Sequence, residues 1–298
     1  MTRAEERKIR EGSLAGLGLL GEAQVDQACA LIRQLGEREI ETVRVLFPDQ
    51  HGILRGKTIV ASALGSIFAN GMAAPSTLLL KDTSYRTVFS IWDGEGGNST
   101  PMGGAGDILM CPDPATFRVL PWSPHSSWIL CDTFDKSGAE IAFAPRTVLR
   151  RALRQMAELD LGLVVGLEVE FHVFEAVDPR RDHAAATMPG QPPLTRPLEQ
   201  GFQFLAETRY DLLEPVMDEL RRTAQALALP VRSTEVEMGP SQFEFTFDPA
   251  DPLTHADNMV MFRTMVKEVC ARRGLHATFM CRPKLDNCVA SGWHLHQS

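Results

Sequence analysis

The segment 166–171, Gly-Leu-Glu-Val-Glu-Phe, constrains the fold more than any other part of the sequence. Side chains alternate between the two faces of an extended chain, so its apolar residues share one face and Glu168 and Glu170 share the other. Adjacent carboxylates repel one another unless a divalent cation lies between them. The segment therefore predicts a half-buried strand whose polar face is either solvated or part of a metal site.

A second carboxylate-rich segment, 235–244, reads Glu-Val-Glu-Met-Gly-Pro-Ser-Gln-Phe-Glu. Its Gly-Pro pair predicts a turn between two extended pieces. After the turn, phenylalanines alternate with polar residues over 242–247, which again indicates a strand with one apolar face. The turn can bring Glu237 close to Glu244, although an ordinary amphipathic edge strand would have the same pattern.

The segment 291–298 carries two histidines, in the order Ser-Gly-Trp-His-Leu-His-Gln-Ser. If it is extended, His294, His296 and Ser298 lie on one face. Two imidazoles at this spacing can bind a metal or reach a phosphate, but surface histidines are also common. Carboxylates combined with a histidine favour Mg²⁺ or Mn²⁺ over structural zinc, which recruits cysteine.

A carboxylate-rich metal site with open positions suits phosphoryl transfer from ATP. The sequence contains no GxxxxGK[ST] motif and no GxGxxG motif at a strand–helix turn. Any nucleotide site is therefore expected to be of another design.

The length of 298 residues fits two domains. Residues 1–23 are interpreted as a disordered or helical leader, and 24–140 as a small domain of a helix at 24–36 and several short strands. Residues 141–298 alternate helices and strands, which predicts an α+β fold with an α/β catalytic layer. The expected helices begin near Pro145 and cover 212–229 and 256–273, the expected strands cover 163–174, 242–247 and 291–298, and loops are expected at 92–106 and 178–199.

The formal net charge of -8 argues against a general affinity for nucleic acid or anionic membranes. No apolar run is long enough for a transmembrane segment. The six cysteines form no CxxC pair, which favours free thiols in a reducing cytoplasm.

Taken in order, these motifs resemble the bacterial glutamine synthetase family. The resemblance includes Phe47-Pro48-Asp49 with Gly52, Arg55-Gly56-Lys57, the three segments above and Ala277-Thr278-Phe279-Met280. It runs from about residue 25 to the last residue. The segment 106–132 is most similar to the branch that includes γ-glutamylpolyamine synthetases and related γ-glutamyl-amine ligases.

The resemblance implies an N-terminal β-grasp domain at 24–140 and the first part of a funnel-like catalytic half-barrel at 141–298. It implies that Glu170, Glu237 and Glu244 hold a metal near glutamate and the amine. Glu168 and His294 would hold a second metal that bridges the ATP phosphates.

The remaining roles implied by the resemblance concern ligands and assembly. His296 and Ser298 would contact the nucleotide, and Gly292 and Gln242 the substrate. Asp49, on a hairpin that reaches into a neighbouring subunit, would bind ammonium or the amine and take its proton. Such shared sites imply a ring-shaped homo-oligomer.

The sequence departs from the family at several points. Ser241 replaces a glycine, Arg282 replaces a lysine, and the loop 286–290 lacks the usual Asn-Gly. The family also continues past the His-x-His-x-Ser motif with a metal carboxylate, phosphate-clamping arginines and a flap. We therefore interpret the chain as a fragment or truncated product, and expect residues 1–298 alone to make no γ-glutamyl amide.

The predicted function is an ATP- and Mg²⁺- or Mn²⁺-dependent ligase that forms a γ-glutamyl amide from glutamate and ammonia or an amine, through γ-glutamyl phosphate. The alternative is a truncated, non-catalytic subunit or binding protein of the same family. A metal-dependent phosphotransferase that makes no amide is less favoured, because Asp49 on its hairpin would have no role.

Overall fold

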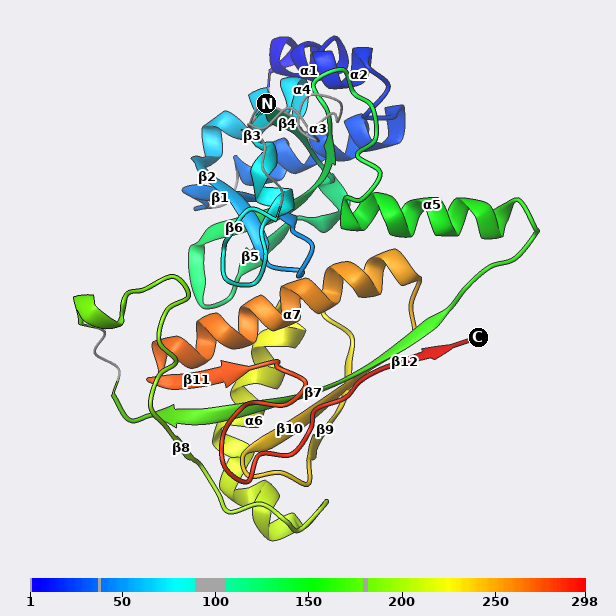
Figure 1. The fold of residues 1–298 in the computed structure, drawn as a ribbon. Helices are drawn as coiled ribbons and strands as arrows, with labels where there is room; N and C mark the ends of the chain where they lie inside the picture. Colours follow the sequence, from blue (N-terminus) through cyan, green and yellow to red (C-terminus); the bar gives the residue numbers. More distant parts are fainter. Residues whose placement is uncertain (1, 37–38, 89–105, 179–181) are drawn as a thin grey trace. The chain divides into compact units, whose positions relative to one another are not determined.

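The computed structural model describes residues 2–36, 39–88, 106–178 and 182–298 (Figure 1). The chain forms two compact units, Met1–Gln155 and Met156–Ser298, each described by itself below. The division lies later than the sequence prediction of 140/141. The reason is Arg146 near the start of α5 (Pro145–Ala157), which donates to Asp113 at 2.9 Å and to Asp132 at 2.8 Å in the first unit. Most of the loop expected at 92–106 lies outside the described residues.

The first unit is built on a mixed sheet with strand order β2-β1-β6-β4-β3, and β5 also pairs with β6. β1 runs parallel to β6, and the other pairs are antiparallel. The strands are β1 (Thr42–Pro48), β2 (Leu54–Val60), β3 (Met72–Pro75), β4 (Asp107–Pro112), β5 (Arg118–Leu120) and β6 (Ser123–Phe134). Whether this unit is a β-grasp stays a prediction.

Helices pack on this sheet and enclose its core. They are α1 (Arg3–Arg10), α2 (Ser13–Gly16), α3 (Glu22–Leu35) and α4 (Leu64–Asn70), with 3₁₀ turns at Ala61–Ala63, Ser76–Leu80 and Pro114–Thr116. Ile9, Leu14 and Leu20 are buried with Val45 and Phe68 in the same core. Residues before 24 are therefore helical, as one of the two alternatives predicts, but they are part of the core rather than a separate leader.

The second unit is built on an antiparallel sheet with strand order β11-β7-β10-β9. The long strand β7 also pairs with β12 and β8. The strands are β7 (Val165–Ala176), β8 (Thr195–Pro197), β9 (Val231–Val236), β10 (Gln242–Phe247), β11 (Leu275–Thr278) and β12 (Trp293–Gln297). Along one edge of β7 lie β12 and then β11, while β10 and then β8 lie along the other.

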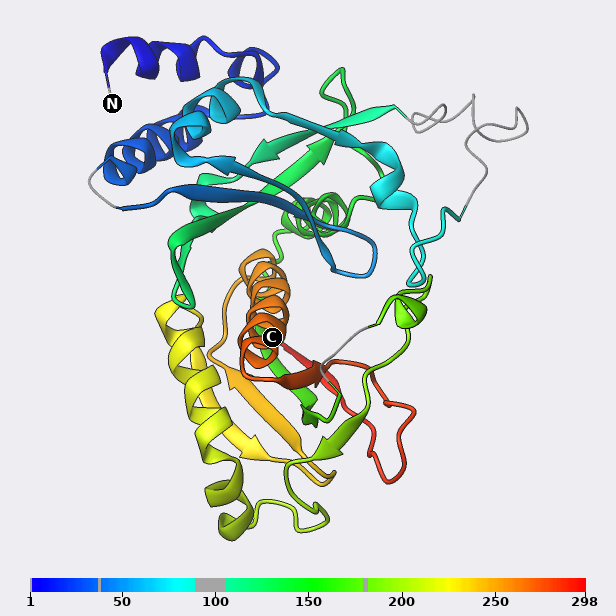
Figure 2. The ribbon, with the colours of Figure 1, turned by 90° about the vertical axis from the view of Figure 1, so that its left-hand side faces the viewer.

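Two long helices, α6 (Glu207–Ala226) and α7 (Pro252–Arg272), pack against this sheet (Figure 2). The alternating phenylalanines supply the contact. Phe171 of β7 lies 5.7 Å, centroid to centroid, from Phe243, Phe245 and Phe262, and 4.8 Å from Phe279. Because the apolar face is covered in this way, the carboxylates of β7 and β10 lie on the opposite face.

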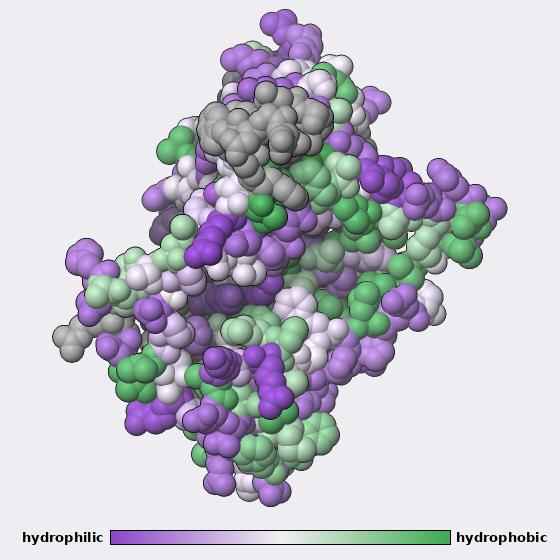
Figure 3. All heavy atoms as spheres, in the orientation of Figure 1, coloured by the Kyte–Doolittle hydropathy of each residue, from purple (hydrophilic) through white to green (hydrophobic). Residues whose placement is uncertain are grey.

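Exposed apolar side chains gather on the segment between α5 and β7, at Leu159, Leu161 and Val164. This segment lies among the green spheres at the right of Figure 3. Within the described residues, no helix combines the length and apolar character needed to cross a bilayer. The six cysteines are free thiols, all buried except Cys281.

Candidate metal centre

Strand register brings the predicted ligands together on the polar face of the second sheet. In the pairing of β7 with β10, Glu170 lies opposite Glu244, and in the pairing with β12, Glu168 lies opposite His294. The strand alternation read from the sequence thus places the carboxylates on one face, as predicted. The pairing partners come from tertiary structure.

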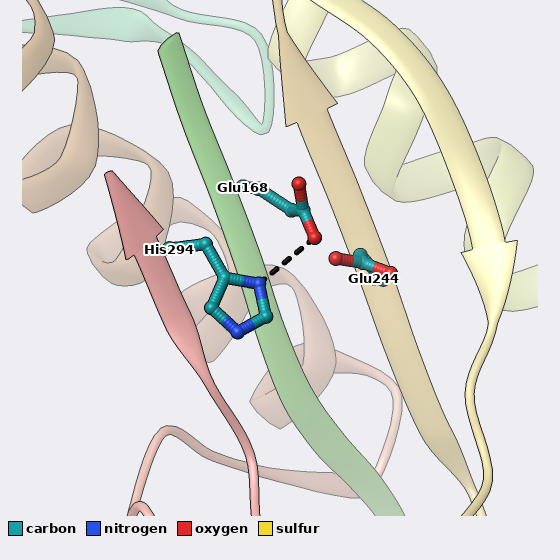
Figure 4. Close-up of side chains that lie close together, drawn as sticks. All are labelled: Glu168, Glu244 and His294. Atoms are coloured by element: carbon teal, nitrogen blue, oxygen red, sulfur yellow. Dashed lines mark hydrogen bonds and ion pairs between the residues drawn. The ribbon is translucent and has the colours of Figure 1, made fainter. Parts of the chain in front are cut away.

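The first cluster consists of Glu168, Glu244 and His294, which offer ligand atoms within 4.8 Å of one another. Figure 4 shows these side chains directed toward one another from three neighbouring strands. Nδ1 of His294 lies 2.8 Å from Oε1 of Glu168. Two carboxylates and an imidazole form a donor set that fits Mg²⁺ or Mn²⁺.

The second cluster consists of Glu170, Glu237 and Glu244, again with ligand atoms within 4.8 Å of one another. Glu237 follows β9 directly, and its Oε2 accepts the N–H of Met238 at 3.0 Å. Glu244 belongs to both clusters. An all-carboxylate set is a hard-cation site, and the shared glutamate places the two candidate positions side by side.

The electrostatics of the clusters favour a cation. Burial and the neighbouring carboxylates of Glu168 and Glu237 raise the pKa of Glu244 to about 9. Hydrogen bonds from Glu244 and His294 lower the pKa of Glu168 to about 2. Among the described residues, the buried Oε1 of Glu244 has no hydrogen-bond partner. Without a cation the pair therefore shares a proton, and a divalent ion can replace that proton and use the free oxygen.

The pKa values of His294 and Glu170 are also raised at this site. The hydrogen bond with Glu168 raises the pKa of His294 above its ordinary value. Burial raises the pKa of Glu170. Both shifts mean that protons compete with a metal for these ligands more strongly than they would in solution.

Gln242 supports the centre from inside the protein. It is fully buried, and its Nε2 donates to Oε2 of Glu170 at 3.0 Å and to the carbonyl of Ala290 at 2.9 Å. Its Oε1 accepts the N–H of Gly239 at 2.8 Å. The amide thus holds Glu170 and the adjoining turn, and the expected direct contact of Gln242 with substrate stays a prediction.

Two buried residues extend this support and were missed in the sequence. Oγ of Ser291 lies 3.1 Å from Nε2 of Gln242 and 3.2 Å from Nδ1 of His172. Burial lowers the pKa of His172 to about 4, so the ring is neutral at physiological pH. The alternation that selects Glu168 and Glu170 also places His172 on their face, which was the available signal.

Gly292 lies against both clusters. A Cβ at this position would lie 2.4 Å from Nε2 of His294 and 3.0 Å from Oε1 of Glu170. The carbonyl of Gly292 accepts the N–H of Glu170 at 3.1 Å. A side chain at this position would therefore displace the imidazole of His294 or the carboxylate of Glu170.

The two residues expected at the nucleotide lie at the exposed end of β12. Nε2 of His296 lies 3.0 Å from Oε2 of Glu168, so one carboxylate bonds both histidines of the motif. Ser298 pairs through its backbone with Val164 at 3.0 Å in both directions, and its side chain is exposed. Both residues are accessible, and their contact with nucleotide stays a prediction.

Asp49 belongs to the first unit and to neither cluster. It lies at the tip of the hairpin between β1 and β2, where only 1% of its surface is exposed. Its Oδ1 accepts the N–H groups of His51 and Ile53, both at 2.9 Å, and its Oδ2 accepts Nε of Arg55 at 2.9 Å. The carboxylate therefore builds the turn, and its expected catalytic role stays a prediction.

Comparison with known proteins agrees with this geometry. Residues 142–298 match the family described as glutamine synthetase, catalytic domain. The chain belongs to the glutamine synthetase family. The match covers all the residues of both clusters.

Individual relatives include enzymes named for γ-glutamyl amide products. The chain is 33% identical to the gamma-glutamylanilide synthase of Acinetobacter sp over 92% of its own length and 57% of the relative's. It is 31% identical to the gamma-glutamylethanolamide synthetase of Streptomyces coelicolor, over 87% and 54%. A solved structure of GmaS without ligand is 27% identical, with a TM-score of 0.71, covering 90% of this chain and 56% of that one. The chain thus spans about half the length of the relatives it matches.

Proposed function

We propose that this chain carries metal-binding machinery of an ATP-dependent ligase that joins an amine to the γ-carboxylate of glutamate. The observation that carries the proposal is the pair of carboxylate clusters sharing Glu244, on the polar face of a sheet in a chain of the glutamine synthetase family. In the proposed reaction, the γ-carboxylate of glutamate attacks the γ-phosphoryl of ATP and releases ADP. The amine then displaces phosphate from γ-glutamyl phosphate.

Mg²⁺ or Mn²⁺, when bound, would neutralise phosphate oxygens and orient the transferred group. Residues of this chain would hold the two ions and position their ligands. Glu170, Glu237 and Glu244 would hold one ion, and Glu168, His294 and Glu244 the other. Gln242 keeps Glu170 in place by its 3.0 Å hydrogen bond, and Gly292 leaves room beside His294. His296 and Ser298 would contact the nucleotide.

The co-substrate is proposed to be ammonia or a primary amine. Relatives named for anilide and ethanolamide products support an amine larger than ammonia. Asp49 is proposed to bind the amine and take its proton in a neighbouring copy, which requires a ring-shaped homo-oligomer. The β-grasp assignment of the first unit and a cytoplasmic location belong to the same proposal.

The deciding experiment is an ATP-dependent γ-glutamyl hydroxamate assay with Mg²⁺ or Mn²⁺, using the protein that contains these residues. Glu170→Gln is the control, since it keeps side-chain volume and removes one ligand charge. Turnover that is lost in the variant supports the ligase. Wild-type protein that binds Mn²⁺ but forms no hydroxamate or alkylamide would instead support the non-catalytic alternative.

The same assay tests the expectation that residues 1–298 alone make no γ-glutamyl amide. The expectation rests on the family resemblance, in which further electrostatic groups follow the His-x-His-x-Ser motif, and one such group typically contributes about 10²–10³-fold to the rate. Turnover within about tenfold of a complete homologue would refute that expectation.

A further inference from the structure

We propose that the buried ion pair of Arg209 and Glu199 positions the turn 237–241, and through it the metal ligands Glu237 and Glu244. The proposal rests on the metal-binding part of the proposed function. It assigns Arg209 and Glu199 as positioning residues, because neither belongs to a cluster.

Arg209 is 6% exposed and uses its whole guanidinium group. Nε and Nη2 donate to the two carboxylate oxygens of Glu199 at 2.9 and 2.8 Å. Nη1 donates to the carbonyl of Glu237 at 2.8 Å, and Nη2 to that of Gly239 at 3.1 Å. The side chain thus binds the backbone of a cluster residue directly, and Nη1 also reaches the carbonyl of Gln203 at 2.7 Å.

Glu199 holds the other end of the turn. Its Oε1 accepts the N–H of Ser241 at 2.9 Å, and its Oε2 accepts that of Gly201 at 2.6 Å. The hydroxyl of Ser241 in turn accepts the N–H of Leu198 at 2.6 Å. Arg209 therefore bonds the backbone of the turn before Pro240, and Glu199 bonds it after Pro240.

The turn needs such support because its backbone is strained. Ser241 has φ +55°, in the left-handed region that favours glycine. Gly201 packs so closely that a Cβ there would lie 2.5 Å from the nitrogen of Pro240. The segment 198–201 thus packs directly against the turn. The ion pair holds the turn in its strained conformation, and β10, which carries Glu244, begins at the next residue.

Stability alone does not account for this pair. Taking two charges out of water costs several kcal/mol per ion, and a buried pair often does no better than apolar side chains of equal volume. What Arg209 provides instead is geometry, because its planar fork can bond a carboxylate and several carbonyls at once. A position set in this way matters most where ligand atoms must lie within a few tenths of an ångström, as at a metal.

The test compares Arg209→Met and Arg209→Lys with wild type, in Mn²⁺ titrations of the whole chain followed by electron paramagnetic resonance. Arg146→Met is the matched control. Arg146 is similarly buried, at 5% exposure, and bonds the carboxylates of Asp113 and Asp132, but in the first unit. Unfolding in urea is measured for every variant.

We expect Arg209→Met to weaken Mn²⁺ binding by about 10–100-fold, the usual effect of removing a group that orients metal ligands. Arg209→Lys should recover only part of the affinity, since an ammonium cannot bond Glu199 and both turn carbonyls together. Arg146→Met should lower stability yet leave Mn²⁺ affinity within about twofold. The spectrum of bound Mn²⁺ should also change in the Arg209 variants alone.

Equal Mn²⁺ affinity and spectra in wild type and a folded Arg209→Met would overturn the proposal. If Arg209→Met does not fold, Arg209→Lys decides, and wild-type affinity in that variant would likewise overturn it. Wild-type chain that binds no Mn²⁺ at all would refute the metal centre itself, a result distinct from failure of the positioning role.

Discussion

Replacing Glu244 by glutamine should separate folding from metal binding more sharply than any other single change. Glu244 is 5% exposed and contributes to both clusters, so Glu244→Gln removes a charged ligand from each. With a pKa of about 9, Glu244 is protonated near neutral pH when no metal is bound. Glutamine has nearly the same volume as this protonated, uncharged side chain. The metal-free variant should therefore fold as well as the wild type.

The magnitude follows from the ligand sets and the pKa. Losing a direct ligand should cost more than losing an orienting group, so Mn²⁺ affinity should fall by at least about 100-fold. In the wild type, a cation must also displace the proton of Glu244. This makes apparent affinity rise about tenfold per pH unit between pH 6 and 8 through this group, in addition to the effect of His294.

The assay is calorimetric Mn²⁺ titration of both proteins at pH 6, 7 and 8, with urea unfolding in chelator. The slope of log affinity against pH should be lower in Glu244→Gln by about one proton. Glu235→Gln is the control, because Glu235 lies opposite Glu244 on β9 but belongs to neither cluster. Unchanged affinity and an unchanged slope in Glu244→Gln would refute the reasoning about a shared ligand.

Three further results are expected. Gly292→Ala should weaken Mn²⁺ binding by about 10–100-fold, because the new Cβ would force the imidazole of His294 away. Mn²⁺ titration of the variant, with its unfolding in urea as the control, checks this, and wild-type affinity in the folded variant would contradict it. Ser241→Ala should lower the free energy of unfolding in urea by about 1–3 kcal/mol, because it leaves the N–H of Leu198 unpaired and keeps the strained φ. Ser241→Gly also leaves that N–H unpaired but relieves the strain, so it should lower the free energy of unfolding less. A larger loss in Ser241→Gly than in Ser241→Ala would contradict this explanation. Without metal, the free energy of unfolding should fall as pH rises from about 4.5 towards 9, because Glu244 loses its proton at a lower pH in the unfolded chain than in the folded one. Urea unfolding of wild type and Glu244→Gln at several pH values checks this. A free energy of unfolding that rises with pH in the wild type relative to Glu244→Gln would exclude a raised pKa.

The polar face of the centre could be predicted from sequence because alternation is a local property. β10 was predicted with the bounds that the structure gives, 242–247, since three phenylalanines alternate with polar residues there. The same rule placed Glu168 beside Glu170. Pairing register is not local, so the contact of His294 with Glu168 rested on the family resemblance and not on the residues themselves.

Other features depended on contacts that no short pattern encodes. Only the end of β9 was predicted, as the extended piece before the Gly-Pro turn, and the short β11 was not predicted as a strand; neither has a clear alternation. Nothing marks Arg209 in the sequence, because an arginine near the start of a helix is usually solvated. The burial of Ile9 was missed for a similar reason, since charged residues surround it in α1.

The inward carboxylate of Asp49 links the proposed chemistry to motion. Its Oδ1 is saturated by two backbone N–H groups and its Oδ2 is bonded to Arg55, so no oxygen faces solvent. An amine can give Asp49 a proton only after the hairpin tip opens or Arg55 swings away. Amine capture would then be gated by a loop fluctuation, on the microsecond-to-millisecond scale typical of such segments. In that case turnover would depend on solvent viscosity and on Arg55, which holds Oδ2 of Asp49.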